Sequence, residues 1–138
     1  MDAQLGKIKP YPDTIAALKE QQKLTKILIF SNVEQAHLEA MVERLEGFKP
    51  DFVGTMQQAS MAKPNPRAYL WVLDKCNLDV KDVIYCAGPM RDVQGAMATG
   101  MKGAWLNRGE DQIAGNIDGG VKPDWEIKNL HELTKIVE

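Results

Sequence analysis

The chain has 138 residues, the length of a single domain, and its 17 Lys and Arg against 19 Asp and Glu give a net charge of −2 at pH 7. This balance excludes the strongly basic surface that binding to phosphate backbones requires, so no nucleic-acid partner is expected. Hydrophobic residues make up 44% of the sequence, which excludes a disordered chain. No apolar run approaches the about 18 residues that span a bilayer, so no membrane partner is expected.

Two features of the sequence favour a cytoplasmic protein. Residues 1–4 do not form an apolar secretory segment, so the cytosol is the expected compartment. Cys76 and Cys86 match no zinc-ligand or Cys-x-x-Cys spacing. In a reducing compartment we therefore expect two buried thiols and no disulfide.

In chain order, helical periodicity alternates with short apolar runs. A first helix is expected from Pro12, with Ile15, Leu18 and Gln22 on one face. The later helices are expected at residues 33–45, at 67–76 with Pro66 as the first residue, at 92–99 and at 130–137. The strands are expected at residues 26–30, 52–55, 83–87, 103–106 and 124–127. Residues 62–66, with two prolines, and the glycine-rich residues 108–122 are expected as loops.

Strands that alternate with helices of about 10–15 residues are typical of parallel α/β units. The sequence therefore predicts an α/β fold built as a three-layer, Rossmann-like parallel sheet. We expect one domain over residues 1–138. In such open sheets, ligands bind beyond the carboxyl ends of the strands, and the polar residues at those ends become the candidate site.

Four polar residues follow the ends of the predicted strands. Ser31 and Asn32 follow the first strand, where a hydroxyl and the backbone N–H groups of the next helix can hold an anion. Lys63 lies in the proline-rich loop after the second strand, and Asp92 follows the third. Each has a simpler explanation: Ser31 or Asn32 caps a helix, Asp92 suits a helix N-terminus, and Lys63 is an ordinary surface lysine.

The order and spacing of three segments resemble the haloacid dehalogenase superfamily, most closely its 2-haloacid dehalogenase branch. Segments 27–32, 63–69 and 92–96 read Ile-Leu-Ile-Phe-Ser-Asn, Lys-Pro-Asn-Pro-Arg-Ala-Tyr and Asp-Val-Gln-Gly-Ala. They are similar to the second, third and fourth motifs of the family. Segments 10–14, 105–108 and 123–127 resemble further stretches of the branch, so the resemblance extends from about Pro10 to Val137.

The resemblance implies a hydrolase in which an aspartate carboxylate displaces a halide beside the substrate carboxylate, and water then hydrolyses the ester. Ser31 and nearby N–H groups would hold the substrate carboxylate, Asn32 would cradle the halide, and Tyr69 would contact the substrate end of the site. Lys63 would keep the nucleophile ionised, and Asp92 would orient Lys63 and assist the water. The implied partner is a small 2-haloacid or another small carboxylate.

The family's first motif, an aspartate at the end of an N-terminal strand followed by a cap, has no match in this sequence. Asp2 and Ala3 echo the branch's Asp-Ala pair, but no strand precedes them. We therefore expect the chain to correspond to the C-terminal two-thirds of a typical member, without its first strand and cap, and to be inactive by itself. A fragment, a displaced gene start and a diverged short form are all consistent with this expectation.

The fourth motif departs from the family at three neighbouring positions. Phosphatase members carry an acid at the position of Gly88 and use it to bind Mg²⁺, whereas Gly88 has no side-chain oxygen. We therefore expect no metal and no cofactor, which favours a dehalogenase over the alternative of a Mg²⁺-dependent phosphatase. Ala87 and Pro89 replace the Ser and Asn of the dehalogenases. The other alternative is a non-catalytic domain that binds a partner or completes a longer chain.

The absence of the first strand has a consequence for the sheet. In the family this strand lies between the strands that correspond to residues 27–30 and 83–87. We expect these two strands either to pair directly in a compacted sheet or to receive a strand from a second chain. An edge of this kind favours pairing between chains, so a homodimer is one expected assembly.

Overall fold

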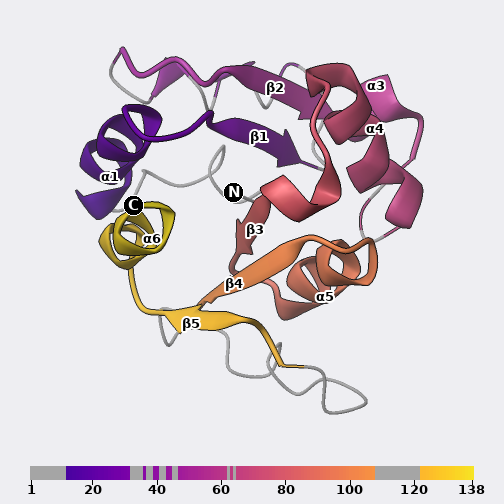
Figure 1. Cartoon of the computed structure of the whole chain (residues 1–138). Helices are drawn as coiled ribbons and strands as arrows, with labels where there is room; N and C mark the ends of the chain where they lie inside the picture. Colours follow the sequence, from indigo (N-terminus) through magenta and orange to yellow (C-terminus); the bar gives the residue numbers. More distant parts are fainter. Residues whose placement is uncertain are drawn as a thin grey trace.

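Strands and helices alternate along the chain in the computed structural model, which describes residues 12–31, 36, 39, 40, 43, 44, 47–61, 63, 65–107 and 122–138 (Figure 1). The helices are α1 (Pro12–Gln22), α3 (Met56–Ala59), α4 (Pro66–Cys76), the 3₁₀ helix η2 (Val80–Asp82), α5 (Met90–Ala98) and α6 (Leu130–Val137). The strands are β1 (Leu28–Ser31), β2 (Phe52–Thr55), β3 (Ile84–Ala87), β4 (Lys102–Leu106) and β5 (Trp125–Ile127). This alternation confirms the predicted α/β class.

The described strands form two parallel sheets. Strand β1 pairs with β2, with Leu28 opposite Phe52 and Ser31 opposite Thr55. Strand β4 lies between β3 and β5 in the other sheet, and both of these pairs are parallel as well. Parallel strands joined through helices are the arrangement that the alternating pattern predicted.

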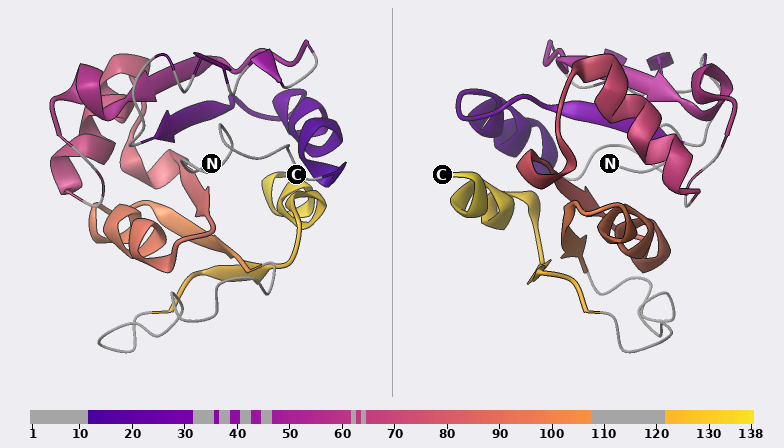
Figure 2. Two further views of the ribbon diagram at one scale, coloured as in Figure 1. Left: turned by 180° about the vertical axis from the view of Figure 1, so that it is seen from behind. Right: turned by 45° about the vertical axis from the view of Figure 1, so that its right-hand side comes forward.

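The expected direct pairing of the first and third predicted strands is wrong. Strands β1 and β3 belong to separate sheets, and their ribbons lie apart, with a gap between them, in Figures 1 and 2. Helices bridge the gap: Gln21 Nε2 of α1 donates to the carbonyl of Leu130 at 2.8 Å and to Thr134 Oγ1 of α6 at 3.2 Å. On the other side, Tyr69 and Leu73 of α4 share a buried cluster with Ala96 of α5. These helix pairs hold the two sheets together without merging them.

Most predicted elements are present, with small shifts at their ends. Helix α5 begins at Met90, two residues before the predicted start, and the carbonyl of Pro89 accepts hydrogen bonds from the N–H groups of Asp92 and Val93. Helix α4 begins at Pro66 as predicted, and the Asn65 side chain accepts a hydrogen bond of 2.9 Å from the Arg67 N–H. Segments 33–35 and 108–121, like Asn32, lie outside the described residues, and residues 36, 39, 40 and 43 are helical.

Two short helices and one helix face differ from the prediction. Helix α3 begins directly after β2 because Thr55 and Gln58 form a reciprocal capping box, a Thr-x-x-Gln pattern that the sequence contains. Helix η2 is stabilised by Asp79, whose side chain accepts from the Lys81 N–H. Helix α1 buries a different set from the predicted one, namely Thr14, Ala17, Leu18 and Gln21. Only Leu18 was predicted, because the expected face took no account of the contact with α6.

No helix in the described ranges combines the length and the apolarity that a membrane span needs.

Candidate active site

The centre of the candidate site is the ammonium group of Lys63, whose side chain is 2% exposed. Its Nζ atom lies 3.2 Å from Asp92 Oδ2, 2.8 Å from Tyr85 Oη and 3.2 Å from the carbonyl oxygen of Phe30. A lysine ammonium has three protons, so it can donate to acceptors from several elements at once. Lys63 is therefore a buried, hydrogen-bonded cation, and the surface-lysine alternative is wrong.

The partners of Lys63 come from both sheets. Phe30 lies in β1, Tyr85 lies in β3, and Asp92 lies in the first turn of α5, directly after β3. Lys63 thus bridges the carboxyl-terminal ends of β1 and β3, which the gap separates. The predicted approach of Lys63 and Asp92 to salt-bridge distance is confirmed. The start of α5 also favours the negative charge of Asp92 through the helix dipole.

Aromatic rings surround the ammonium on two sides. Lys63 Nζ lies 5.8 Å from the centre of the Phe30 ring and 5.5 Å from that of Tyr85. Both distances are within the range of cation–π attraction, which is stronger where water is excluded. The Tyr69 and Tyr85 rings meet edge to face with centroids 5.3 Å apart. The site is therefore a cation in a largely aromatic and dry environment.

Tyr69 is nearly inaccessible, with 2% of its surface exposed, and its hydroxyl donates to the backbone carbonyl of Asp92 at 2.8 Å. Burial raises the pKa of the Tyr69 hydroxyl above its usual value, and the negative charge of Asp92 raises that pKa further. Tyr69 is thus a neutral donor that holds the first turn of α5. Its predicted contact with the substrate stays a prediction.

Ser31 ends β1 and is fully buried, opposite the equally buried Thr55 at the end of β2. Ser31 follows Phe30, whose carbonyl accepts a hydrogen bond from Lys63. The Lys63 ammonium therefore lies at the strand end that carries Ser31. Asn32, predicted to cradle the halide, lies outside the described residues. Of the five predicted site residues, the structure therefore brings four together, namely Ser31, Lys63, Tyr69 and Asp92.

Tyr85 and the Phe30 carbonyl were not predicted as parts of the site, although both contact Lys63. The sequence placed Tyr85 inside an apolar strand, where an aromatic residue is ordinarily explained by packing. One signal was present: a tyrosine in a strand buried on both faces carries a hydroxyl that needs a partner. Every residue has a backbone carbonyl, so the sequence does not indicate which one accepts a hydrogen bond from Lys63. The contact with the Phe30 carbonyl could therefore not be predicted.

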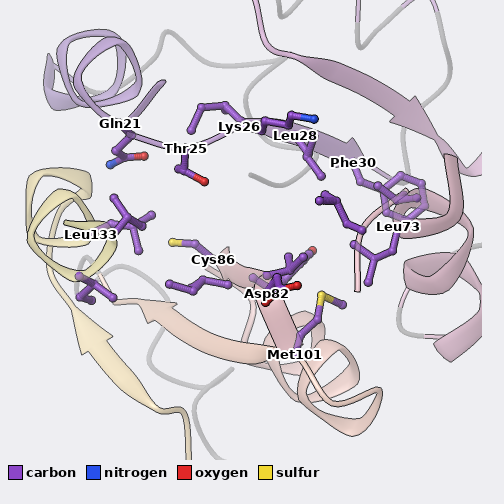
Figure 3. A pocket seen from close by; sticks show the side chains of 18 of the residues that line it. Gln21, Thr25, Lys26, Leu28, Phe30, Leu73, Asp82, Cys86, Met101 and Leu133 are labelled. Carbon is purple, nitrogen blue, oxygen red and sulfur yellow. The ribbon is translucent and has the colours of Figure 1, made fainter. Parts of the chain in front are cut away.

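A cavity of about 460 Å³ adjoins this cluster and extends along the gap between the sheets (Figure 3). Leu28 and Phe30 of β1 line one side, and Ile84, Tyr85 and Cys86 of β3 line the other. Tyr85 therefore contacts Lys63 and borders the cavity, which links the candidate site to the space between β1 and β3.

The residues near the cluster do not fit a magnesium ion. Gly88 supplies no side-chain oxygen, and its carbonyl accepts from Trp105 Nε1 at 2.9 Å. Asp92 already pairs with Lys63. In the part of the chain that the structure describes, no three His, Cys, Asp or Glu side chains gather as a metal site would require. The described residues near Asp92 therefore do not support a magnesium-dependent step.

A parallel α/β core with a buried Lys–Asp pair and a buried serine at its strand ends defines a hydrolase-type core. The family model for haloacid dehalogenase-like hydrolases matches residues 2–106, and the chain belongs to this family. Its membership agrees with the resemblance carried by Ser31, Lys63 and Asp92.

Curated relatives and a solved structure support this assignment. The chain is 26% identical, over 97% of its length, to the (S)-2-haloacid dehalogenase of Pseudomonas sp. (strain YL), of which it covers 56%. It is 24% identical, over 99% of its length, to the glyceraldehyde 3-phosphate phosphatase of Methanopyrus kandleri, of which it covers 60%. The fold is similar to that in the structure of the L-2-haloacid dehalogenase from Xanthobacter autotrophicus with chloropropionic acid covalently bound, with a TM-score of 0.83 and 23% sequence identity. The similarity covers 96% of this chain and 62% of the dehalogenase chain. The chain thus spans less than two thirds of each of these proteins.

Proposed function

We propose that this chain contributes two parts of the active site of a dehalogenase-like hydrolase that acts on small 2-halocarboxylates. These parts are the lysine ammonium group and the groups that bind the substrate carboxylate. The observation that supports this most strongly is the buried Lys63 ammonium, held by Asp92 at 3.2 Å beside the strand end that carries Ser31. A buried cation at this position can stabilise a carboxylate nucleophile in its ionised form, because desolvation strengthens their attraction.

The proposed roles divide between the members of the cluster. Ser31, with neighbouring backbone N–H groups, binds the substrate carboxylate, and Asn32 binds the departing halide. Lys63 supplies the counter-charge for the nucleophile. Asp92 positions Lys63, and Tyr69 holds Asp92 through its backbone carbonyl.

The proposed reaction has two displacements. A carboxylate oxygen attacks the carbon that bears the halogen, forming a C–O bond as the C–halogen bond breaks and halide leaves. Water then attacks the carbonyl of the ester, which regenerates the carboxylate and releases a 2-hydroxy acid and a proton. The sequence offers no match to the family's nucleophile motif, so we expect the 138-residue chain alone to show no turnover above background.

Binding of the substrate carboxylate tests the proposal without requiring turnover. We expect titration with (S)-2-chloropropionate, followed by NMR, to shift the amide signals of Ser31 and its neighbours. The variant Ser31→Ala should bind about tenfold more weakly, a loss of about 1.4 kcal/mol. Ser60→Ala provides the matched control, since Ser60 is exposed and lies outside the cluster. Equal affinity of both variants would contradict the proposed role of Ser31.

The phosphatase alternative is supported by one relative that is a phosphatase. The donor groups around Asp92 argue against a magnesium-dependent reaction, because Gly88 cannot supply a carboxylate. Inorganic phosphate in the same titration distinguishes the two functions. Saturable binding of phosphate that strengthens with Mg²⁺ would favour the phosphatase.

We also propose that the protein is located in the cytoplasm. Cys76 and Cys86 are both free thiols, as a reducing compartment such as the cytosol allows.

A further inference from the structure

Tyr85 is a polar side chain of the site to which the proposed reaction assigns no role. It lies in β3, and its Oη atom is 2.8 Å from Lys63 Nζ. A lysine ammonium has only donors, so the Tyr85 hydroxyl is the acceptor in this hydrogen bond. The centre of the Tyr85 ring also lies 5.5 Å from the same nitrogen, within the range of cation–π attraction. One side chain thus contacts the ammonium through both its hydroxyl and its ring.

Contacts of this kind determine where the Lys63 ammonium lies. A lysine side chain has a flexible four-carbon stem, so the stem alone does not fix the position of the charge. Asp92, at 3.2 Å, holds the ammonium from the first turn of α5. The carbonyl of Phe30, also at 3.2 Å, holds it from β1. Tyr85 adds a contact from β3, so these contacts reach the ammonium from three elements.

The Tyr85 contact differs from the Asp92 contact in charge. A hydroxyl accepts a hydrogen bond without bringing a negative charge, whereas the carboxylate of Asp92 brings one. An uncharged acceptor therefore fixes the ammonium without neutralising it. A second carboxylate at this place would compete with a carboxylate nucleophile for Lys63 and would repel it. A tyrosine is thus suited to hold a lysine that has to attract one further anion.

A second tyrosine holds the other member of the ion pair. The hydroxyl of Tyr69 donates to the backbone carbonyl of Asp92 at 2.8 Å. The rings of Tyr69 and Tyr85 meet edge to face with centroids 5.3 Å apart, which is a favourable arrangement of two aromatic rings. Contact therefore runs from Lys63 through both rings to the turn that carries Asp92. The two tyrosines link the position of the ammonium to that of the carboxylate.

We propose that Tyr85 is a positioning residue of this site, which fixes the Lys63 ammonium through the Tyr85 hydroxyl. The inference rests on the proposed function in one respect, because that function makes Lys63 the counter-charge of the nucleophile. The hydrogen bond itself can be measured in the 138-residue chain without turnover. Because Tyr85 acts through Lys63, its hydroxyl should affect ligand binding only while Lys63 is present.

Exchange of the Lys63 ammonium protons with water tests this positioning. Side-chain nitrogen NMR detects a lysine ammonium whose protons exchange slowly, and Lys63→Met identifies the signal by removing it. Tyr85→Phe keeps the ring and removes the hydroxyl, so it should accelerate the exchange at least about tenfold, as for the loss of one hydrogen bond to a charged group. A variant with an unchanged rate, or a natural chain whose Lys63 signal is lost to fast exchange, would overturn the proposal.

Cys86→Ala is the matched control on the same strand. Adjacent residues of a strand point to opposite faces. Accordingly, Cys86 packs against the cluster that contains Leu130, whereas Tyr85 packs against the cluster that contains Tyr69. The control shortens a side chain of β3 on the other face, so the Lys63 exchange rate should stay close to that of the natural chain. Equal acceleration in Cys86→Ala and Tyr85→Phe would show a general loosening of β3 and would contradict a specific role of Tyr85.

A double-variant cycle connects Tyr85 with the proposed chemistry. Tyr85→Phe should weaken the binding of (S)-2-chloropropionate at least about threefold when Lys63 is present, and should have no effect in the Lys63→Met background, because coupled residues are not additive. Equal losses in both backgrounds would show that Tyr85 does not act through Lys63.

The two readouts separate the proposed function from the role of Tyr85. A natural chain that does not bind chloropropionate would contradict the proposed function, and the ammonium exchange would still decide whether Tyr85 positions Lys63. Chloropropionate binding that depends on Ser31, together with an ammonium exchange that ignores Tyr85→Phe, would contradict the positioning role alone.

Discussion

The ammonium group of Lys63 is ion-paired and hydrogen-bonded in an environment that excludes water. Its side chain is 2% exposed, and Asp92 is the carboxylate that the described residues place against it. Separating such a pair costs more than losing a surface ion pair, because the remaining charge cannot recover its hydration. The pair therefore matters for folding as well as for the proposed chemistry.

The first prediction concerns this pair. The variant Asp92→Asn should lower the free energy of unfolding by about 3–5 kcal/mol, because it removes the carboxylate that the described residues place against the buried Lys63 ammonium. The double variant Lys63→Met/Asp92→Asn should lose less than the single variant, since the isolated charge is gone. Urea unfolding of the single and double variants measures both effects. A double variant less stable than Asp92→Asn would contradict this explanation.

The second prediction concerns the raised pKa of Tyr69. Its folded-state pKa exceeds the unfolded value of about 10, so the folded state binds the proton more tightly. The stabilisation is complete below about pH 10 and is lost as the pH rises further. Tyr69→Phe should therefore lose about 1 kcal/mol at neutral pH, from the hydrogen bond to Asp92. Between pH 9 and pH 11 its stability should fall less steeply than that of the natural chain, as measured by urea unfolding at each pH. Parallel pH profiles would show that Tyr69 does not titrate as described.

At the level of elements, α5 packs directly on β4 at Gly103. A Cβ atom at this position would meet Met97 Cγ and Val93 Cγ1, each at 2.7 Å. Val93 is fully buried, so it has little room to move. The close approach of α5, which carries Asp92, thus depends on the absence of a side chain at residue 103.

The third prediction tests this packing. Gly103→Val should lower the free energy of unfolding by about 1–3 kcal/mol, because the added side chain overpacks the α5–β4 contact. Adding Met97→Ala should restore part of the loss by opening space beside the new side chain. Ala98→Val, on the exposed side of α5, is the control and should stay within about 0.5 kcal/mol. Thermal unfolding of these variants would contradict the prediction if Gly103→Val matched the control.

At the level of the whole molecule, the division into two sheets limits stability. A cavity of about 460 Å³ deprives the side chains on its walls of packing partners. Domains have a net stability of only about 5–15 kcal/mol, so a defect of this size consumes a large part of it.

The fourth prediction is that the chain alone is marginally stable, with a free energy of unfolding near or below about 5 kcal/mol. Exposed strand edges should also promote self-association as concentration rises. Urea unfolding at low concentration and sedimentation velocity over a range of concentrations measure the two properties. A monomer at every concentration, with a stability well above 5 kcal/mol, would contradict the prediction.

Much of this architecture could be predicted from the sequence because its signals are local. The apolar run that forms β3 and the Pro66 start of α4 each follow from a few adjacent residues. The Lys63–Asp92 contact followed from the order of motifs, because parallel strands bring their carboxyl ends to one edge. The open gap could not be predicted, because it depends on the spacing that the long-range contact between α1 and α6 gives the two sheets. The role of Tyr85 depends on the same long-range geometry.

The positions of the tryptophans provide each sheet with its own optical reporter. Trp71 packs against Phe30 and Phe52, with ring centroids 6.3 Å and 6.1 Å away, and so reports on the β1–β2 sheet. Trp105 and Trp125 lie on β4 and β5, and the chain has three tryptophans in total. Fluorescence of variants that retain either Trp71 or the other two would therefore follow the two halves separately. Coincident transitions would show that the helices alone make the halves one cooperative unit, whereas separated transitions would reveal a native state in which one sheet melts before the other.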